Sequence, residues 1–213
     1  RSLLQISGIL FELAQAEIDW NWLWVPTCTR SWTSVMGHPS LGCRDRPWHL
    51  SFLIAEIQKM NHWLMKSEPN DFNIDDLRTA PGRETYWDGV RNYQARNFMR
   101  DQMKQGDLVF FYHSNCAEPG ITGIAKISWE AYPDHTTFNP KDKHYDPKSD
   151  PDNPRWHMVN ISYQRKLNRM IPLSKLREYS DRQLKNLTLL RRGNRLSITP
   201  VDAKEWFFIL SLE

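Results

Sequence analysis

Three short clusters of polar side chains stand at the end of a predicted strand or just before a predicted helix. They are Lys66-Ser-Glu-Pro69, Tyr86-Trp-Asp-Gly-Val-Arg-Asn-Tyr-Gln-Ala-Arg-Asn97 and Phe110-Phe-Tyr-His-Ser-Asn115. Polar groups in such positions gather at the mouths of small barrels, where ligands bind. Trp87 offers a stacking surface, and Asp88, Arg91 and Asn92 offer groups that read the edge of an extruded nucleobase. A structural interpretation competes with this one, with Trp87 in the core and Asn92 as a helix N-cap.

The sequence contains no signature of a known catalytic or cofactor-binding motif. It lacks GxSxG, HExxH, P-loop and GxGxxG patterns, and its seven histidines have no metal-ligand spacing. Cys116 follows His113 by three residues, but a small buried thiol at a strand end is a simpler interpretation than a nucleophile. We therefore expect no enzyme activity, no metal and no cofactor.

Basic residues are concentrated in residues 164–195, although the whole chain carries a formal net charge of only +3. The segment contains two acidic residues and ten basic ones, namely Arg165, Lys166, Arg169, Lys175, Arg177, Arg182, Lys185, Arg191, Arg192 and Arg195. This excess of positive charge suits contacts to nucleic-acid phosphates, although a solvated helical face gives the same pattern. Gly193 permits a positive φ, so residues 191–195 can present several guanidinium groups on one turn.

Short strands mixed with short helices must position these residues. Strands are predicted at 62–66, 108–112, 121–129, 156–163 and 196–199. Helices are predicted at 92–104, at 174–179 after Ser174, and at 181–190. A shorter helix follows Asn73, where Asp76 completes a capping box, and a last one is expected after Thr199 as N-cap with Pro200 at its first position.

The segment 132–154 is predicted to be a long loop because it holds five of the 13 prolines. A loop of this length inside a compact domain is usually functional or disordered. The elements show no repeated βαβ order. They favour an α+β (mixed α/β) fold, either a small mixed β-barrel or a curled sheet with flanking helices.

The first 59 residues differ in composition from the rest of the chain. They hold five of the ten tryptophans, carry no net charge, and show neither helical nor strand periodicity beyond residue 18. Our hypothesis is that Met60 is the natural start and that 1–59 is upstream sequence read in frame, poorly ordered or loosely packed. The alternative is an N-terminal extension that packs on the domain.

The sequence also predicts a cellular compartment. No secretory signal pattern and no apolar run of 18 residues is present, and the three cysteines are not closely spaced. We therefore expect a reducing compartment, with no membrane association. The predicted location is cytoplasmic, or nuclear if the source is eukaryotic.

Several motifs resemble those of the EVE domain family. They are Trp63-Leu-Met-Lys-Ser-Glu-Pro69, Trp87-Asp-Gly-Val-Arg-Asn-Tyr-Gln-Ala-Arg-Asn97, Met103-Lys-Gln-Gly-Asp107, Phe110-Phe-Tyr-His-Ser-Asn115, Pro119-Gly-Ile-Thr-Gly123, Tyr145-Asp-Pro-Lys148, Pro154-Arg-Trp156 and Leu190-Arg-Arg-Gly-Asn-Arg-Leu196. The resemblance covers residues 60–213 and not 1–59. It implies a PUA-like fold, which is a curled β-barrel with flanking helices, and kinship with YTH domains, which bind N6-methyladenine in an aromatic cage. It also implies a chain that reads modified bases in DNA or RNA rather than making them.

The resemblance and the polar clusters together define two sets of candidate residues. The modified-base pocket comprises Lys66, Ser67, Glu68, Trp87, Asp88, Val90, Asn92, Tyr112, His113, Ser114, Asn115 and Trp156, with Trp156 or Tyr112 as the second wall of an aromatic cage. The contacts to the nucleic-acid backbone comprise Arg91, Arg182, Lys185, Arg191, Arg192, Asn194 and Arg195. The expected ligand is a methylated or hydroxymethylated cytosine or a modified adenine, flipped onto Trp87 by a monomeric, non-catalytic reader.

Two other functions stay open on the sequence alone. Relatives in the wider PUA-like group, the ASCH hydrolases, use a lysine and a glutamate, so Lys66 and Glu68 are candidates for a nucleoside amidohydrolase site. The third alternative is a protein-interaction module, in which residues 164–195 form only a solvated face.

Overall fold

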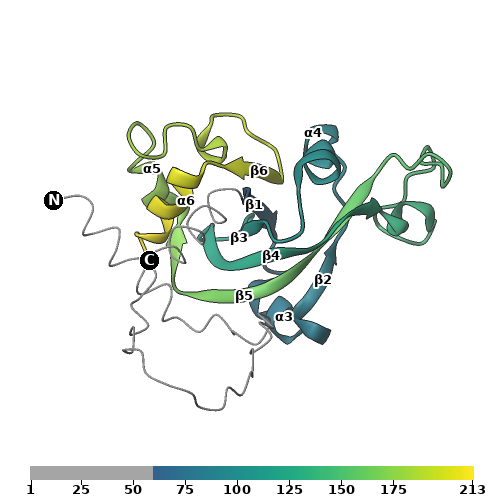
Figure 1. Ribbon diagram of the computed structural model, residues 1–213, viewed down its shortest axis with the longest axis horizontal. Coiled ribbons are helices and arrows are strands. Elements are labelled where there is room, and N and C mark those ends of the chain that lie inside the picture. The colour runs from purple at the N-terminus through teal and green to yellow at the C-terminus, as the bar shows by residue number, and fades with distance from the viewer. Residues whose placement is uncertain (1–59) are drawn as a thin grey trace, which may run out of the picture. The chain divides into compact units, whose positions relative to one another are not determined.

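The computed structural model describes residues 60–213, and our hypothesis about residues 1–59 lies outside this part of the chain. Residues 60–213 form a six-stranded sheet with a few short helices (Figure 1). The strands are β1 (His62–Ser67), β2 (Glu84–Trp87), β3 (Leu108–His113), β4 (Gly120–Pro133), β5 (His157–Pro172) and β6 (Ile198–Val201). The helices are α3 (Ile74–Thr79), α4 (Tyr93–Asn97), α5 (Leu173–Arg177) and α6 (Ala203–Leu210). This is the predicted α+β class.

The strand order in the sheet is β2-β5-β4-β3-β1-β6. β1 and β3 run parallel, so Ser67 at the end of one pairs with His113 at the end of the other, and their polar ends share one edge. β4 and β5 extend further than predicted and curve strongly (Figure 1), with register shifts along their pairing. No pairing joins β2 to β6 within residues 60–213, so the fold is a curled sheet and not a closed barrel.

The sheet buries hydrophobic side chains on both faces. Trp63 and Phe111 belong to one core cluster, whereas Leu64 and Phe110, their neighbours in sequence, belong to the other. Successive side chains of a strand point to opposite faces, so the continuous hydrophobic run of β3 fills both cores, as predicted. Trp206 of α6 stacks on Phe110 with ring centroids 3.7 Å apart and closes the second core.

Both helix starts predicted from asparagine are confirmed. The side chain of Asn73 accepts the backbone N–H groups of Asp75 and Asp76 at 2.8 and 3.0 Å, and the Asp76 carboxylate accepts the N–H of Asn73 at 2.8 Å. Asn92 caps α4 in the same way. The helix predicted over 92–104 divides into α4 and a π-turn at Phe98–Gln102.

The last predicted strand and the C-terminal helix are both present with shifted bounds, whereas the helix predicted over 181–190 does not form. Residues 181–190 form turns and a 3-10 turn at Thr188–Leu190, and the buried Glu205 carboxylate accepts the backbone N–H of Asn186 at 3.1 Å. The N-cap of α6 is Asp202, whereas Thr199 and Pro200 lie in β6. β6 is an edge strand, where the missing N–H of a proline costs no sheet hydrogen bond.

The start of α5 also differs from its prediction. The N-cap position is Pro172, which makes no side-chain capping hydrogen bond, so Ser174 is inside the helix and does not cap it. Because β5 runs directly into α5 here, tertiary packing and not a local cap sets the start of this helix.

Candidate functional site

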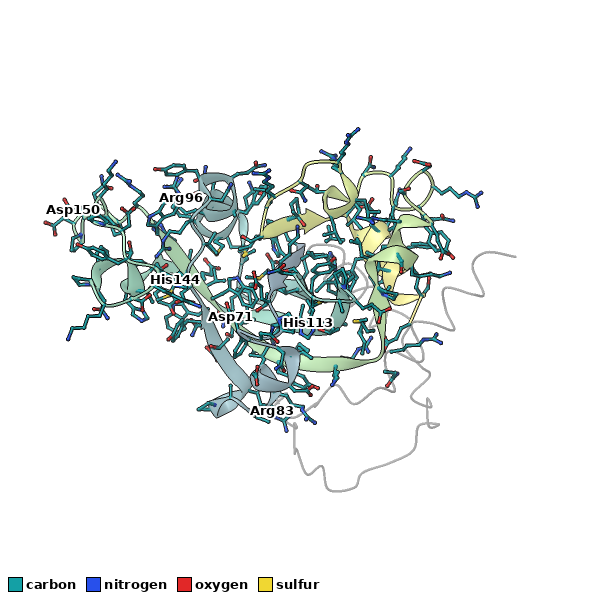
Figure 2. All side chains as sticks on the ribbon, turned by 180° about the vertical axis from the view of Figure 1, so that it is seen from behind. Asp71, Arg83, Arg96, His113, His144 and Asp150 are labelled. Atoms are coloured by element: carbon teal, nitrogen blue, oxygen red, sulfur yellow. The ribbon has the colours of Figure 1, made fainter. Side chains whose placement is uncertain are left out.

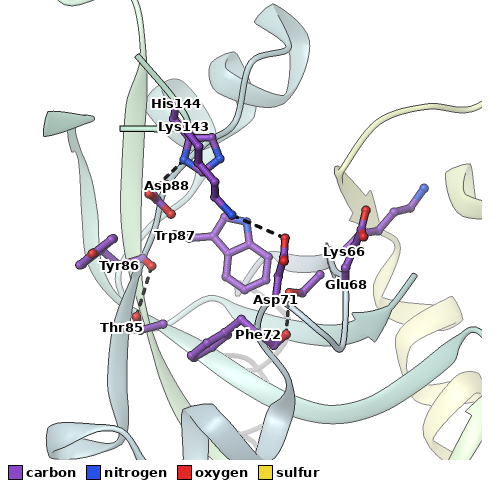
Figure 3. A pocket seen from close by; sticks show the side chains of 11 residues that line it. Lys66, Glu68, Asp71, Phe72, Thr85, Tyr86, Trp87, Asp88, Lys143 and His144 are labelled. Carbon is purple, nitrogen blue, oxygen red and sulfur yellow. Dashed lines mark hydrogen bonds and ion pairs between the residues drawn. The ribbon is translucent and has the colours of Figure 1, made fainter. Parts of the chain in front are cut away.

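A pocket of about 400 Å³ opens where β1 ends, beside β2 and the long loop between β4 and β5 (Figure 3). Its lining consists of Lys66, Ser67, Glu68, Asp71, Phe72, Thr85, Tyr86, Trp87, Asp88, Lys143 and His144. Five of these belong to the predicted base pocket: Lys66, Ser67, Glu68, Trp87 and Asp88. The volume falls in the range of small-molecule sites, about 300–1,000 Å³.

Trp87 lies at the centre of this pocket (Figure 3). The side chain is 9% exposed, and Phe111 meets its ring edge-to-face with centroids 5.6 Å apart. Phe72 packs on the same core cluster and also lines the pocket. Trp87 is therefore both a core residue and the aromatic surface of the site, and its ring is held before any ligand arrives.

The turn after β1 is fixed by hydrogen bonds from its own side chains and from the end of β3. Ser67 donates its hydroxyl to the carbonyl of Phe72 at 2.6 Å. Asn115 donates its side-chain amide to the Glu68 carboxylate at 3.0 Å, and the hydroxyl of Ser114 donates to the carbonyl of Ser67. Ser114 and Asn115 thus lie directly behind the pocket lining, where they position Ser67 and Glu68.

The long loop forms one wall of the pocket, and Arg91 holds it in place. Arg91 pairs with the carboxylate of Asp134 at 2.8 Å and donates two further hydrogen bonds to the carbonyl of His144. Asp134 is fully buried, and it also accepts the backbone N–H groups of Gly89 and Thr136. The geometry therefore gives Arg91 a role in positioning the loop, and its contact with the nucleic-acid backbone stays a prediction.

His144 is packed against Gly89 and hydrogen-bonded to Asp88. Its Nδ1 lies 3.4 Å from the Asp88 carboxylate, and Asp142 approaches the same nitrogen at 3.7 Å. Gly89 has φ +70°, and a Cβ at this position would lie 2.6 Å from Nε2 and 2.8 Å from Nδ1 of His144. A glycine is required here both by the backbone conformation and by the close approach of the imidazole.

A pair of glycine substitutions separates these two requirements. We expect Gly82→Ala to lose about 1–2 kcal/mol of stability because of its positive φ, and Gly89→Ala to lose more, because its Cβ also meets the His144 ring. Gly82 has no atom within 4 Å of an added Cβ, whereas Gly89→Ala must push the His144 ring away from Asp88. Only Gly89→Ala should shift the indole N–H resonance of Trp87. The measurements are denaturant unfolding and an NMR spectrum, and equal spectra for the two variants would contradict this packing.

Lys66 and Glu68 both line the pocket, but they differ in environment. Glu68 is exposed, whereas burial lowers the pKa of the Lys66 ammonium. The Lys66 side chain extends away from Trp87 (Figure 3), and its backbone N–H donates to the carbonyl of Ser197 at 2.8 Å. This hydrogen bond brings the chain just after the basic turn 191–195 to the edge of the pocket.

Three predicted pocket residues are buried elsewhere and do not line the pocket. Val90 lies in the core cluster of Trp87. Tyr112 belongs to the cluster on the opposite face of the sheet, where burial raises the pKa of its hydroxyl to about 12. Trp156 is buried below Tyr93, with centroids 5.0 Å apart, and donates its indole N–H to Asp146 at 2.7 Å.

Two further predicted residues serve neighbouring elements. His113 is half-buried behind Phe111, with centroids 5.7 Å apart, and Asn92 is the N-cap of α4. The aromatic residues that accompany Trp87 in the lining are Phe72 and Tyr86 instead of Tyr112 or Trp156.

The basic segment is divided between structural ion pairs and an exposed turn. Structural pairs join Arg165 to Glu213, Lys166 to Asp75, and Lys175 to Glu178. Five residues predicted to bind the nucleic-acid backbone are exposed and, within residues 60–213, have no carboxylate at ion-pair distance: Arg182, Lys185, Arg191, Arg192 and Arg195. Gly193 has the expected positive φ of 78°, and Asn194 stabilises this turn by donating to the carbonyl of Thr188.

Sequence reasoning missed six lining residues, namely Asp71, Phe72, Thr85, Tyr86, Lys143 and His144. The long proline-rich loop was the available signal, since it carries Lys143 and His144. Figure 2 shows His144 between Asp150, at the far end of this loop, and Asp71 of the turn after β1. The loop therefore folds back toward the pocket.

Two further observations concern the described part of the chain. Among residues 60–213, no group of three or more histidine, cysteine or acidic side chains is arranged to hold a metal ion. No helix in the same residues is long and apolar enough to cross a membrane.

A curled six-stranded sheet with few helices and a pocket at its edge is consistent with the PUA-like class of domains. The EVE domain family model matches residues 61–212. The chain belongs to this family, as the motif resemblance implied.

Relatives and solved structures support the same assignment. The chain is 51% identical over 168 residues to thymocyte nuclear protein 1 of Homo sapiens, which covers 72% of this chain and 74% of the relative. A crystal structure of human THYN1 protein in complex with 5-methylcytosine containing DNA matches with a TM-score of 0.69 and 51% identity, covering 71% of this chain and 96% of that chain. A crystal structure of a Pseudomonas syringae protein matches with a TM-score of 0.67 and 46% identity, covering 71% and 98%.

Proposed function

We propose that this protein is a non-catalytic reader of a modified nucleobase in nucleic acid, and that 5-methylcytosine in DNA is its first candidate ligand. The observation that carries the proposal is a pocket in which the Trp87 ring lies among the carboxylates of Glu68, Asp71 and Asp88. The human THYN1 structure with 5-methylcytosine containing DNA supports the choice of ligand. A hydroxymethylated cytosine, a modified adenine and RNA stay within the proposal.

The charges in the pocket favour a base that carries an exocyclic amine. Carboxylate oxygens accept hydrogen bonds from the N4 amine of cytosine, and adenine offers a similar N6 amine. Thymine and uracil lack such an amine. Glu68, Asp71 and Asp88 each have acceptor positions beyond those that their present partners occupy.

Base flipping is energetically accessible at this site. Extrusion of a base costs a few kcal/mol, and stacking on Trp87 returns about 1–3 kcal/mol. Burial of one methyl group adds about 1 kcal/mol, which alone gives about fivefold preference. The exposed basic turn, which lies next to Lys66 through Ser197, supplies phosphate contacts that hold the strand during extrusion.

Titration of the full chain tests this function. Labelled single- and double-stranded oligonucleotides with plain or modified cytosine and adenine are titrated at two salt concentrations. We expect at least about fivefold tighter binding of one modified base, superimposed on salt-dependent binding of all oligonucleotides. Salt-dependent binding without preference would leave only a backbone-binding surface. No binding at low salt would reject the proposal.

A nucleoside amidohydrolase is a second candidate, and one observation favours it. Lys66 and Glu68 line the same pocket, and the lowered pKa of Lys66 makes its amine easier to deprotonate. Release of product from an acylated cytidine, lost in Lys66→Met, would establish the enzyme.

A protein-interaction module would bind no nucleotide. The monomeric state and the cytoplasmic or nuclear location stay predictions.

A further inference from the structure

Lys143 reaches across the mouth of the pocket to the turn after β1. Its Nζ lies 3.6 Å from the carboxylate of Asp71, and the two side chains are 69% and 65% exposed. Figure 3 shows this ion pair in front of the Trp87 ring. An ion pair with this much solvent contributes little to stability, so an incoming ligand can separate it at small cost.

The backbone of Lys143 is fixed although its side chain is exposed. The next residue, His144, donates its N–H to Asp142 at 2.8 Å, and its carbonyl accepts from Arg91, which is anchored on the buried Asp134. The Lys143 ammonium can therefore swing about a stationary attachment point beside the pocket. Within residues 60–213, Asp71 is its only carboxylate at ion-pair distance.

The charge of the lining creates a requirement for such a cation. Two lysines face three carboxylates, so the lysine and carboxylate charges of the lining sum to a net negative charge. A nucleotide that enters it carries a phosphate on each side of its sugar, and these phosphates would be repelled by the carboxylates. The side chain of Lys66 extends away from Trp87, and the basic turn 191–195 ends before Ser197, the residue that pairs with Lys66, which leaves Lys143 at the mouth (Figure 3).

We propose that Lys143 exchanges partners when a base enters. It leaves Asp71 and binds a phosphate next to the extruded nucleotide, and the released Asp71 carboxylate then accepts a hydrogen bond from the exocyclic amine of the base. The Lys143–Asp71 pair therefore couples two events, the binding of the nucleic-acid backbone over the pocket and the recognition of the base edge. The inference rests on the proposed function and assigns the ligand as a nucleotide within a strand, not a free base.

Oligonucleotides with a neutral methylphosphonate in place of one phosphate test the exchange. The two phosphates that flank a single 5-methylcytosine are replaced in turn, and binding is measured for the full-length chain and for Lys143→Met. We expect one replacement to weaken the unsubstituted protein about tenfold, the size of a lost charge-assisted hydrogen bond. Lys143→Met should bind the native strand about tenfold more weakly and should no longer respond to that replacement.

Two control variants isolate the role of the lysine. Lys148→Met removes an exposed lysine of the same loop that does not line the pocket, and it should keep the full methylphosphonate effect. Asp71→Asn breaks the ion pair but keeps Lys143, so it should also keep that effect while it weakens the preference for the amine-bearing base.

The outcomes separate this inference from the proposed function. If Lys143→Met stays as sensitive to both methylphosphonates as the unsubstituted protein, the inference is wrong. It is equally wrong if the unsubstituted protein ignores both replacements while it still prefers 5-methylcytosine. Absence of any preference for a modified base instead rejects the proposed function.

Discussion

Trp87→Ala should abolish most of the preference for a modified base and weaken binding of the modified strand about 5- to 150-fold. This range corresponds to the 1–3 kcal/mol that stacking of a base on an aromatic side chain contributes. Binding of plain oligonucleotides should change little, because the exposed basic turn is separate from Trp87 in sequence. The measurement is a pair of titrations, modified against plain, at one salt concentration.

Trp87 also belongs to the hydrophobic core, so its truncation has a structural cost. Replacing a buried aromatic residue by alanine costs about 3–5 kcal/mol of stability. Trp87→Phe keeps an aromatic face and most of the volume, and we expect it to recover both stability and part of the preference. Trp129→Ala removes a tryptophan that is 64% exposed and does not line the pocket, so it should have no effect. An unchanged ratio of affinities in a folded Trp87→Ala would place the base elsewhere.

The parts of the fold that sequence predicted well are set by local patterns. The hydrophobic run of β3 and the capping box of Asn73 each have a cause within a few residues, and the structure confirms both. The failures occur where tertiary contacts decide. Glu205 takes a backbone N–H of the segment predicted as a helix at 181–190, and edge pairing with β1 places Pro200 in a strand.

The same distinction explains the candidate site. Lys66 and Ser67 line the pocket at the end of β1, which was predicted as a strand, whereas Trp87 and Asp88 reach it at the end of β2, which was not predicted. The contribution of the loop was not predictable residue by residue. Arg91, anchored on the buried Asp134, helps to hold His144 at the pocket, and this ion pair joins residues 43 positions apart. Arg91 was consequently predicted as a phosphate contact, since no local pattern distinguishes a guanidinium that pairs with a distant carboxylate from an unpaired one.

The basic segment illustrates a different limit. Its charge excess suggested one functional surface, but the structure separates it into β5, α5 and a turn. Arg165 and Lys166 of β5 and Lys175 of α5 are paired with Glu213, Asp75 and Glu178, which takes three of the ten basic residues out of the exposed, unpaired set within residues 60–213. Counting charges along the chain therefore overstates the surface available to phosphates. The basic turn lies next to Lys66 because β6 pairs with β1, and the composition of the segment gave no sign of this.

Arg91→Met should remove the loop wall and with it the preference for a modified base, without changing the salt dependence of binding. It leaves the buried Asp134 carboxylate without its counter-charge, which costs about 3–5 kcal/mol of stability. For Arg192→Ala we expect the opposite result, an unchanged base preference and a changed salt dependence. Loss of an exposed phosphate contact weakens binding of plain and modified strands alike and lowers the salt slope by about one unit. A reduced salt slope in Arg91→Met would mean that Arg91 binds phosphate after all.

The double variant Arg91→Met/Asp134→Asn distinguishes a loop anchor from a general stabiliser. Without the buried charge, stability should recover substantially, but the carbonyl of His144 still lacks its donor, so the base preference should stay low. Recovery of stability and preference together would show that the anchor acts only through the fold.

Acid sensitivity supplies an independent test of the same anchor. Burial opposes ionisation of Asp134, but hydrogen bonds from Thr136 and Arg91 outweigh it, and the pKa of this carboxyl is lowered. A lowered pKa means that the stabilisation is complete above the ordinary aspartate value of about 3.9 and is lost as the pH falls through the folded-state value. Base preference should therefore persist unchanged from neutral pH to about pH 5. In Arg91→Met, Asp134 loses the guanidinium, so the pKa of its carboxyl should rise. The variant should therefore lose less stability relative to the unsubstituted protein as the pH falls. A difference in unfolding free energy between the two proteins that stays constant across this pH range would contradict the Arg91–Asp134 ion pair.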